Sequence, residues 1–230
     1  MLRIIIVAAG SGSRFGSALP KQFVTLGDRP VLLHTLSALR KAFPEAHCTV
    51  VLSSDYVDFF TSACSQFGMT LPQIVIGGDT RAQSVRNALS AMRLNDGDKV
   101  MIHDSARPVA PHDMLRRISD ALYGGCEAVI PAIPVTDSLR IVPRRPSLPY
   151  SGPSQVTDRS LLLAVQTPQA FDAQVIAEAY RSSFSSALTD DASVYQAHTG
   201  KAPTLVEGSP LNIKITHPRD IDIARLYLNL

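Results

Sequence analysis

The sequence predicts an α/β protein in which helices cover both faces of a mostly parallel, Rossmann-like sheet, with a β-arm protruding from it. Short runs of β-branched residues alternate with longer segments of helical periodicity along most of the chain, a pattern typical of parallel sheets. One proline-rich segment, residues 143–155, interrupts the alternation. We therefore expect one domain, 1–230, that contains an arm at 134–157.

The predicted elements follow in order along the chain. Five apolar runs are short and rich in Ile and Val, which predicts buried strands at 3–8, 49–54, 73–78, 99–104 and 127–133. The intervening segments carry apolar residues at helical spacing, which predicts helices within 30–43, 56–68, 81–94 and 112–125. Ligands of such sheets bind at the carboxyl ends of the strands, so motifs that directly follow a strand have the most weight.

The proline-rich segment PRRPSLPYSGPSQ (143–155) has four prolines and no helical period. It lies between an extended run at 137–142 and the segment 156–163, and we interpret it as the tip of a long hairpin. A flexible surface loop is the alternative. Because a two-stranded excursion is only marginally stable in water, the arm is predicted to pack on a partner subunit.

Composition narrows the class of protein. With 22 Lys and Arg against 20 Asp and Glu, the net charge is +2, so nothing global favours nucleic acid or an anionic membrane as a partner. The three cysteines are scattered and lack the spacing of a metal site, which indicates a protein whose thiols stay reduced. The apolar run at 4–9 is too short for a signal peptide, and no stretch approaches the ~20 apolar residues of a membrane span. We predict a cytoplasmic protein.

A glycine-rich loop, VAAGSGSRFGSALPKQF (7–23), continues from the first predicted strand. It lacks the GxxxxGK[ST] phosphate loop, and it fails the dinucleotide fingerprint GxGxxG because Phe15 replaces the third glycine. Gly10 and Gly12 would let backbone N–H groups converge on phosphate oxygens, with Arg14 and Lys21 as neighbouring cations. We interpret the loop as a triphosphate cradle; a tight turn with two solvated charges is the alternative.

Two further motifs follow predicted strands. In GGDTRAQSV (77–85), Gly78 and Asp79 could read the exocyclic amine of a base, and Ser84 could hold ribose or phosphate; a helix cap at Asp79 or Thr80 is the alternative. In HDSARP (103–108), Asp104 is placed for a ligand hydroxyl or a metal-bound water.

Among the other polar residues of this motif, we assign a candidate ligand role to Arg107 and a structural role to His103. Arg107 could meet a substrate phosphate or Asp104 itself. His103 is interpreted as a buried structural residue.

At these residues the chain resembles the nucleotidyltransferases that activate sugar and polyol phosphates. More narrowly, it resembles the 2-C-methyl-D-erythritol 4-phosphate cytidylyltransferase family of the non-mevalonate isoprenoid pathway. Besides the motifs above, the resemblance extends through 156–171, 189–194 and 207–216. A ribitol-5-phosphate cytidylyltransferase and a non-catalytic nucleotide-binding homologue remain as alternatives.

The resemblance implies transfer of a cytidylyl group from CTP to 2-C-methyl-D-erythritol 4-phosphate, with release of 4-diphosphocytidyl-2-C-methyl-D-erythritol and pyrophosphate. The nucleophile is a phosphate oxygen that is already ionised, so no general base is needed. Arg14 and Lys21 would stabilise charge at the α-phosphate, while Arg159 and Lys214 would hold the attacking phosphate in line. Mg²⁺ would bind mainly through the CTP phosphates, so we name no protein ligand for it.

The resemblance also implies the other site positions. Those expected to contact CTP are Ala8, Ala9, Gly10, Gly12, Gly78, Asp79, Ser84 and Ser105. Those expected to contact the polyol phosphate are Asp104, Arg107, Ser138, Arg159, Thr167 and Lys214. The family usually has Ala at the position of Ser105 and Thr at that of Ser138.

The arm of the family swaps across a two-fold homodimer, so Ser138 and Arg159 would serve the neighbour's site. From the residues alone, Arg159 lies at an apparent helix start, which disfavours a cation and supports a ligand role. Lys214 lies in a short β-like run, where alternation places it opposite Ile213 and Ile215.

Overall fold

The computed structural model describes residues 1–10, 15, 19–143, 147–182 and 188–230. Its main sheet has the strand order β10-β7-β11-β6-β1-β4-β5, with β12 also paired to β7. The parallel part consists of β1 (Leu2–Val7), β4 (His47–Leu52), β5 (Gln73–Ile76) and β6 (Lys99–Asp104), where the first four of the five predicted strands lie. The predicted fold class is confirmed.

The remaining strands extend this sheet on the far side of β6. β11 (Gln169–Asp172) runs antiparallel between β6 and β7 (Ala128–Pro134), and β10 (Leu163–Val165) is antiparallel to β7. β12 (Thr204–Glu207) pairs with β7 in parallel. A small separate ribbon joins β2 (Thr25–Leu26) to β3 (Arg29–Pro30).

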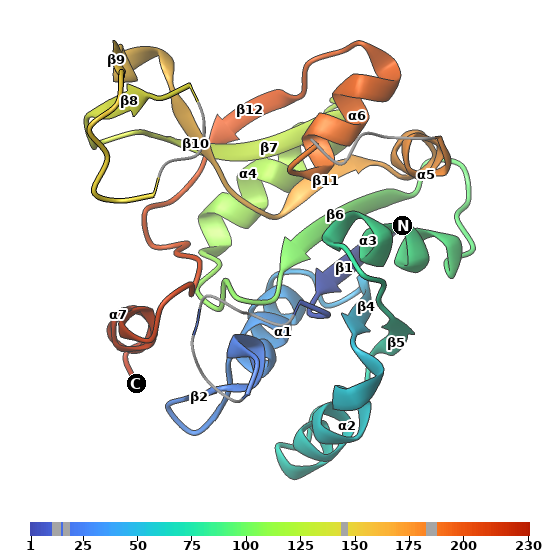
Figure 1. Cartoon of the computed structure of the whole chain (residues 1–230). Helices are drawn as coiled ribbons and strands as arrows, with labels where there is room; N and C mark the ends of the chain where they lie inside the picture. Colours follow the sequence, from blue (N-terminus) through green and yellow to red (C-terminus); the bar gives the residue numbers. More distant parts are fainter. Residues whose placement is uncertain (11–14, 16–18, 144–146, 183–187) are drawn as a thin grey trace.

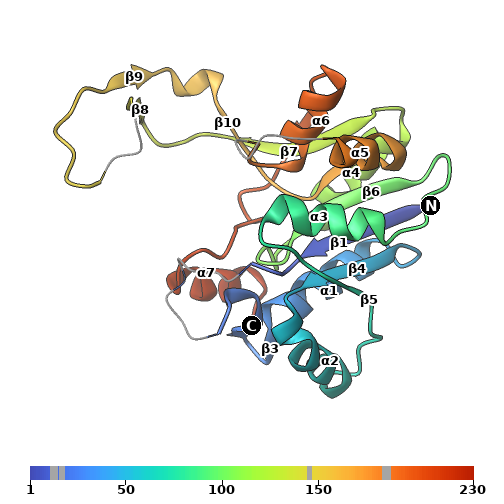
Figure 2. The same cartoon turned by 45° about the vertical axis from the view of Figure 1, so that its right-hand side comes forward.

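Helices cover both faces of the sheet (Figures 1 and 2). α1 (Val31–Ala42), α2 (Val57–Gln66) and α4 (His112–Tyr123) pack on one face, and α3 (Arg81–Ser90), α5 (Ala173–Arg181) and α6 (Asp191–Thr199) pack on the other. Side chains of β1 alternate between these layers, with Ile4 and Ile6 in one and Ile5 in the other. Complete burial of each such side chain contributes roughly 1.5–3 kcal/mol.

A third apolar cluster supports the carboxyl edge of the sheet. α7 (Arg219–Tyr227) contributes Ile221 and Ala224, which gather with Ile215, Val31 and Ala106. Ile215 is fully buried, and its N–H donates to the carbonyl of Ala106 at 2.8 Å. This packing holds the C-terminal segment beside the end of β6.

The arm leaves the sheet after β7 and returns at β10. β8 (Leu139–Ile141) and β9 (Gln155–Thr157) form its two-stranded ribbon, which extends away from the main sheet in Figure 2. Short 3-10 turns occur here at Arg159–Leu161, and elsewhere at Lys21–Phe23 and Ser54–Tyr56.

One local prediction was wrong. The segment 212–216 is not a strand, because the Ile215–Ala106 bond is the backbone contact that anchors it and no ladder continues from it among the described residues. The alternation nevertheless holds, since Ile215 is buried while Lys214 faces Asp104. α3 occupies Arg81–Ser90, within the predicted segment 81–94.

Candidate active site

A pocket with a volume of about 500 Å³ opens at the carboxyl edge of the sheet. The pairing of β1 with β6 aligns Val7 with Asp104, so the glycine loop and the HDSARP motif leave the sheet side by side. Nine of the positions predicted from the sequence line this pocket: Ala9, Gly10, Lys21, Gly78, Asp79, Ser84, Asp104, Ser105 and Lys214.

The glycine loop and the GGDTRAQSV motif approach each other so closely that position 77 has room only for glycine. A Cβ on Gly77 would lie 2.4 Å from the Cβ of Ala9 and 2.9 Å from the Oγ of Ser84. The hydroxyl of Ser84 accepts a hydrogen bond from the N–H of Gly78 at 3.1 Å. Thr80 caps α3, since its side chain accepts from the N–H of Gln83.

The glycine loop is anchored from behind by Gln22. The buried amide of Gln22 donates to the carbonyls of Ala8 and Gly10 at 2.7 and 2.8 Å. Ala8 is buried and does not line the pocket. Lys21 donates to the carbonyl of Ile215 at 2.6 Å, which ties the loop to the C-terminal segment. The predicted residues Gly12 and Arg14 lie outside the described residues.

Asp104 is the centre of charge in the pocket. One carboxylate oxygen accepts from the Lys214 ammonium at 2.7 Å, and the other accepts from the Arg81 Nε at 3.3 Å. The Arg107 guanidinium lies 3.8 Å away. Burial alone would raise the pKa of Asp104, but these three cations hold it well below its usual range.

Arg81 connects this carboxylate to a second, fully buried one. Its two terminal nitrogens donate to the two oxygens of Asp191 at 2.8 and 2.7 Å. Asp191 also accepts from the Tyr180 hydroxyl at 2.6 Å. Sequence reasoning missed Arg81, although its place in the first turn after a predicted strand was a usable signal. Gln22, Thr80 and Thr216 are further pocket residues that were not predicted.

His103 and Thr167 form a hydrogen-bonded chain behind the pocket. The N–H of Asp104 donates to the Thr167 hydroxyl at 3.1 Å, and this hydroxyl lies 3.0 Å from the His103 Nδ1. The His103 Nε2 lies 3.2 Å from the carbonyl of Arg107, an acceptor, so Nε2 carries the proton. Burial lowers the pKa of His103 to about 4, so the imidazole is neutral and structural.

Arg107 and Thr167 border the pocket without lining it. Arg107 is mostly buried and donates to the carbonyl of Asn212 at 2.6 Å. The Thr167 hydroxyl is engaged by Asp104 and His103. Both residues therefore position Asp104 and the C-terminal segment in this structure.

Ser138 and Arg159 lie on the arm, away from the pocket of their own chain. The exposed Arg159 donates to the carbonyl of Thr136. The segment Arg159–Leu161 is a single 3-10 turn capped by Asp158, which is too short to have an appreciable macrodipole. The helix-start argument for a ligand role of Arg159 therefore does not apply.

The donor set of the pocket fits a metal that is held mainly by a ligand. Among the described residues, no group of three His, Cys, Asp or Glu side chains gathers to hold an ion. The carboxylates that line the pocket are Asp79 and Asp104, and the second is already paired with cations. Mg²⁺ favours phosphates and water over protein cages, which agrees with this arrangement.

A mostly parallel sheet with a cation-lined pocket at its carboxyl edge is typical of α/β proteins that bind anionic, phosphate-bearing ligands. The family model described as 2-C-methyl-D-erythritol 4-phosphate cytidylyltransferase matches residues 2–230.

Relatives and solved structures agree with this match. Proteins of that name from Azobacteroides pseudotrichonymphae and Bacteroides fragilis are 36% and 38% identical, each over 97–98% of this chain and 98% of the relative. The solved 4-diphosphocytidyl-2C-methyl-D-erythritol synthase of Anaerococcus prevotii superposes with a TM-score of 0.80 at 27% identity, covering 100% of this chain and 96% of that one. The chain belongs to the 2-C-methyl-D-erythritol 4-phosphate cytidylyltransferase family, and it is a nucleotidyltransferase.

Proposed function

We propose that this chain transfers a cytidylyl group from CTP to 2-C-methyl-D-erythritol 4-phosphate, forming 4-diphosphocytidyl-2-C-methyl-D-erythritol and pyrophosphate. The observation that carries the proposal is the grouping of Asp104 with Lys214 and Arg81 in a pocket that Lys21 also lines. Such a pocket supplies both a polar group for a hydroxyl-bearing ligand and cations for phosphates.

The chemistry requires two anions to meet and needs little proton transfer. One oxygen of the acceptor phosphate attacks the α-phosphorus of CTP, and the bond to the pyrophosphate oxygen breaks. We assign Lys21, with Arg14, to the charge that develops on the α-phosphate and on the leaving group. Lys214 orients the attacking phosphate, and Asp104 holds Lys214 in place by its 2.7 Å contact.

The nucleotide is assigned to the side of the pocket formed by the glycine loop and the start of α3. There Gly78, Asp79 and Ser84 stand opposite Ala9 and Gly10. Position 78 has room only for glycine, because a Cβ there would lie 2.4 Å from the Cγ of Gln83. Ser105 also lines this pocket, and it is assigned to the nucleotide.

Magnesium belongs to the proposal as a companion of CTP. When bound, it would neutralise charge on the triphosphate. Among the described residues, Asp79 and Asp104 are the carboxylates of the pocket that could contribute an oxygen ligand to it.

A homodimer through the arm completes the proposed site. Ile141, Val156 and Leu161 are 57%, 79% and 81% exposed on the arm and its base, and a two-stranded ribbon with such exposure needs a partner surface. Because Ser138 and Arg159 lie away from their own pocket, they are proposed to reach the pocket of a second copy. A cytoplasmic location is also part of the proposal. Among the described helices, none is long and apolar enough to cross a membrane.

The dimer is tested by light scattering after gel filtration. A mass of about twice 24.8 kDa is expected for the parent chain, and a mass near 24.8 kDa for the double variant Val156→Asp, Leu161→Asp. Asp137→Asn, a change on the same arm that adds no charge to an apolar surface, serves as the control. A monomeric parent chain with full activity would overturn the shared site.

The activity is tested by pyrophosphate release from CTP with Mg²⁺. We expect release with 2-C-methyl-D-erythritol 4-phosphate and little with ribitol 5-phosphate. Pyrophosphate release with ribitol 5-phosphate alone would show that the acceptor is a different polyol phosphate. No release with either acceptor, in folded protein, would contradict the proposed transfer.

A further inference from the structure

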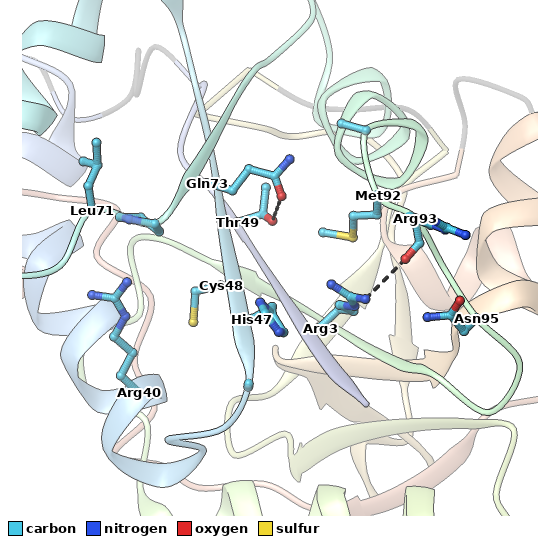
Figure 3. A pocket seen from close by; sticks show the side chains of 13 residues that line it. Arg3, Arg40, His47, Cys48, Thr49, Leu71, Gln73, Met92, Arg93 and Asn95 are labelled. Carbon is cyan, nitrogen blue, oxygen red and sulfur yellow. Dashed lines mark hydrogen bonds between the residues drawn. The ribbon is translucent and has the colours of Figure 1, made fainter.

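A second polar region lies at the edge of the sheet opposite the active-site pocket. One hollow of about 370 Å³ is found where β1, β4 and β5 begin, and another of about 430 Å³ lies between α3 and α5. The two adjoin, because Met92 and Arg93 line both. We name them together the arginine hollows. Figure 3 shows the first of them.

Five arginines line the arginine hollows. Arg3, Arg40 and Arg93 belong to the first, and Arg86, Arg93 and Arg181 belong to the second. In the view of Figure 3, Arg40, His47, Arg3 and Arg93 follow one another across the hollow. Within the described part of the chain, no Asp or Glu lines either hollow, although the whole chain has a net charge of only +2. The region is a local concentration of positive charge.

Partners within the protein account for some of these charges. Arg3 lies 3.5 Å from Asp98. Arg40 and Arg181 lie in the last turns of α1 and α5, where the helix carbonyls favour a cation, and Arg40 also donates to the carbonyl of Thr70 at 2.6 Å.

The side chains of Arg86 and Arg93 lack ion-pair or hydrogen-bond partners of this kind among the described residues. Both are exposed, and neither guanidinium has a hydrogen bond or ion pair with another described residue. Neighbouring guanidinium groups repel one another unless an anion lies between them. Their planar forks match the oxygens of a phosphate in a bidentate manner.

Apolar side chains separate these cations. Leu71 and Met92 line the first hollow, and Leu89, Met92 and Leu94 line the second. Walls of this kind exclude water from part of a bound anion and strengthen its attraction to the arginines.

We propose that the arginine hollows bind a phosphate or diphosphate anion, with Arg93 as the central ligand because it is shared by both. This site is separate from the active-site pocket, since β1 and β5 begin at the first hollow and lead at their other ends to Val7 and Gly78, which line that pocket.

The test is a titration of the full chain with inorganic pyrophosphate, without Mg²⁺, followed by ¹H–¹⁵N TROSY spectra. We expect two groups of amides to shift: those of residues 77–84 at the active-site pocket, and those of residues 47–49 and 91–95 at the arginine hollows. In Arg93→Gln the second group should respond with an affinity weaker by about tenfold, because one charged hydrogen-bonding partner is lost.

Two controls make the assignment specific. Arg116→Gln removes an exposed arginine on α4 that lines neither hollow, and it should leave both groups unchanged. In Arg93→Gln the active-site group should shift as in the parent chain, which shows that the fold and the first pocket are intact. Shifts confined to residues 77–84, or a response at the arginine hollows that Arg93→Gln leaves unaltered, would overturn the proposal.

Discussion

Removal of Asp191 should destabilise the protein far more than removal of a surface carboxylate. Asp191 is fully buried, it holds Arg81 through two bonds of 2.8 and 2.7 Å, and it accepts from Tyr180 at 2.6 Å. Breaking a buried ion pair on one side costs about 3–5 kcal/mol. Asp191→Ala removes the acceptor of two Arg81 hydrogen bonds and of the Tyr180 hydroxyl bond, so we expect a loss of stability within this range. Asp191→Asn keeps one acceptor oxygen at this position, so its free energy of unfolding should fall less than that of Asp191→Ala.

The assay is equilibrium unfolding in urea, followed by circular dichroism. With a slope of about 3 kcal/mol per molar urea for a chain of this size, a loss of ~3–5 kcal/mol lowers the midpoint by about 1–2 M. Asp222→Asn is the matched control, because Asp222 is 77% exposed and pairs with Arg225 at 3.5 Å; such surface pairs contribute at most about 1 kcal/mol. Equal midpoints for Asp191→Ala and Asp222→Asn would refute the reasoning.

Three further predictions concern the pocket. Lys21→Ala should lower kcat by at least about 100-fold while the KM for CTP changes little; steady-state kinetics that show only a KM change would contradict its assigned role. The lowered pKa of Asp104 stabilises the fold at pH values above the unfolded pKa of about 3.9, and this contribution is lost as the pH falls below that value. The free energy of unfolding should therefore fall less between pH 6 and pH 3 in Asp104→Asn than in the parent chain. Gly77→Ala should raise the KM for CTP and lower stability, because its Cβ would lie 2.4 Å from that of Ala9. Gly10→Ala, where a Cβ meets nothing within 4 Å, should keep the parent stability; equal losses in the two would count against steric crowding.

The order of the strands and helices up to residue 133, and the edge that carries the site, could be predicted from the sequence. Runs such as residues 3–8 and 99–104 are apolar enough to be buried on both faces, and that property is local. Parallel strands end at one edge, so Gly10, Gly78 and Asp104 were expected to meet before any contact was known. The pocket contains all three.

What the sequence could not determine were the contacts between residues far apart in the chain. Arg81 reaches Asp191 across 110 positions, and Lys21 reaches the carbonyl of Ile215 across 194. The sequence alone does not show whether a charged side chain is solvated or ion-paired, because its partner is fixed by tertiary packing. The same limit explains Lys214: the expected strand is absent at 212–216, yet burial of Ile215 turns the lysine toward Asp104. Local composition determined the sheet and its functional edge, whereas long-range packing determined which cations face which carboxylates.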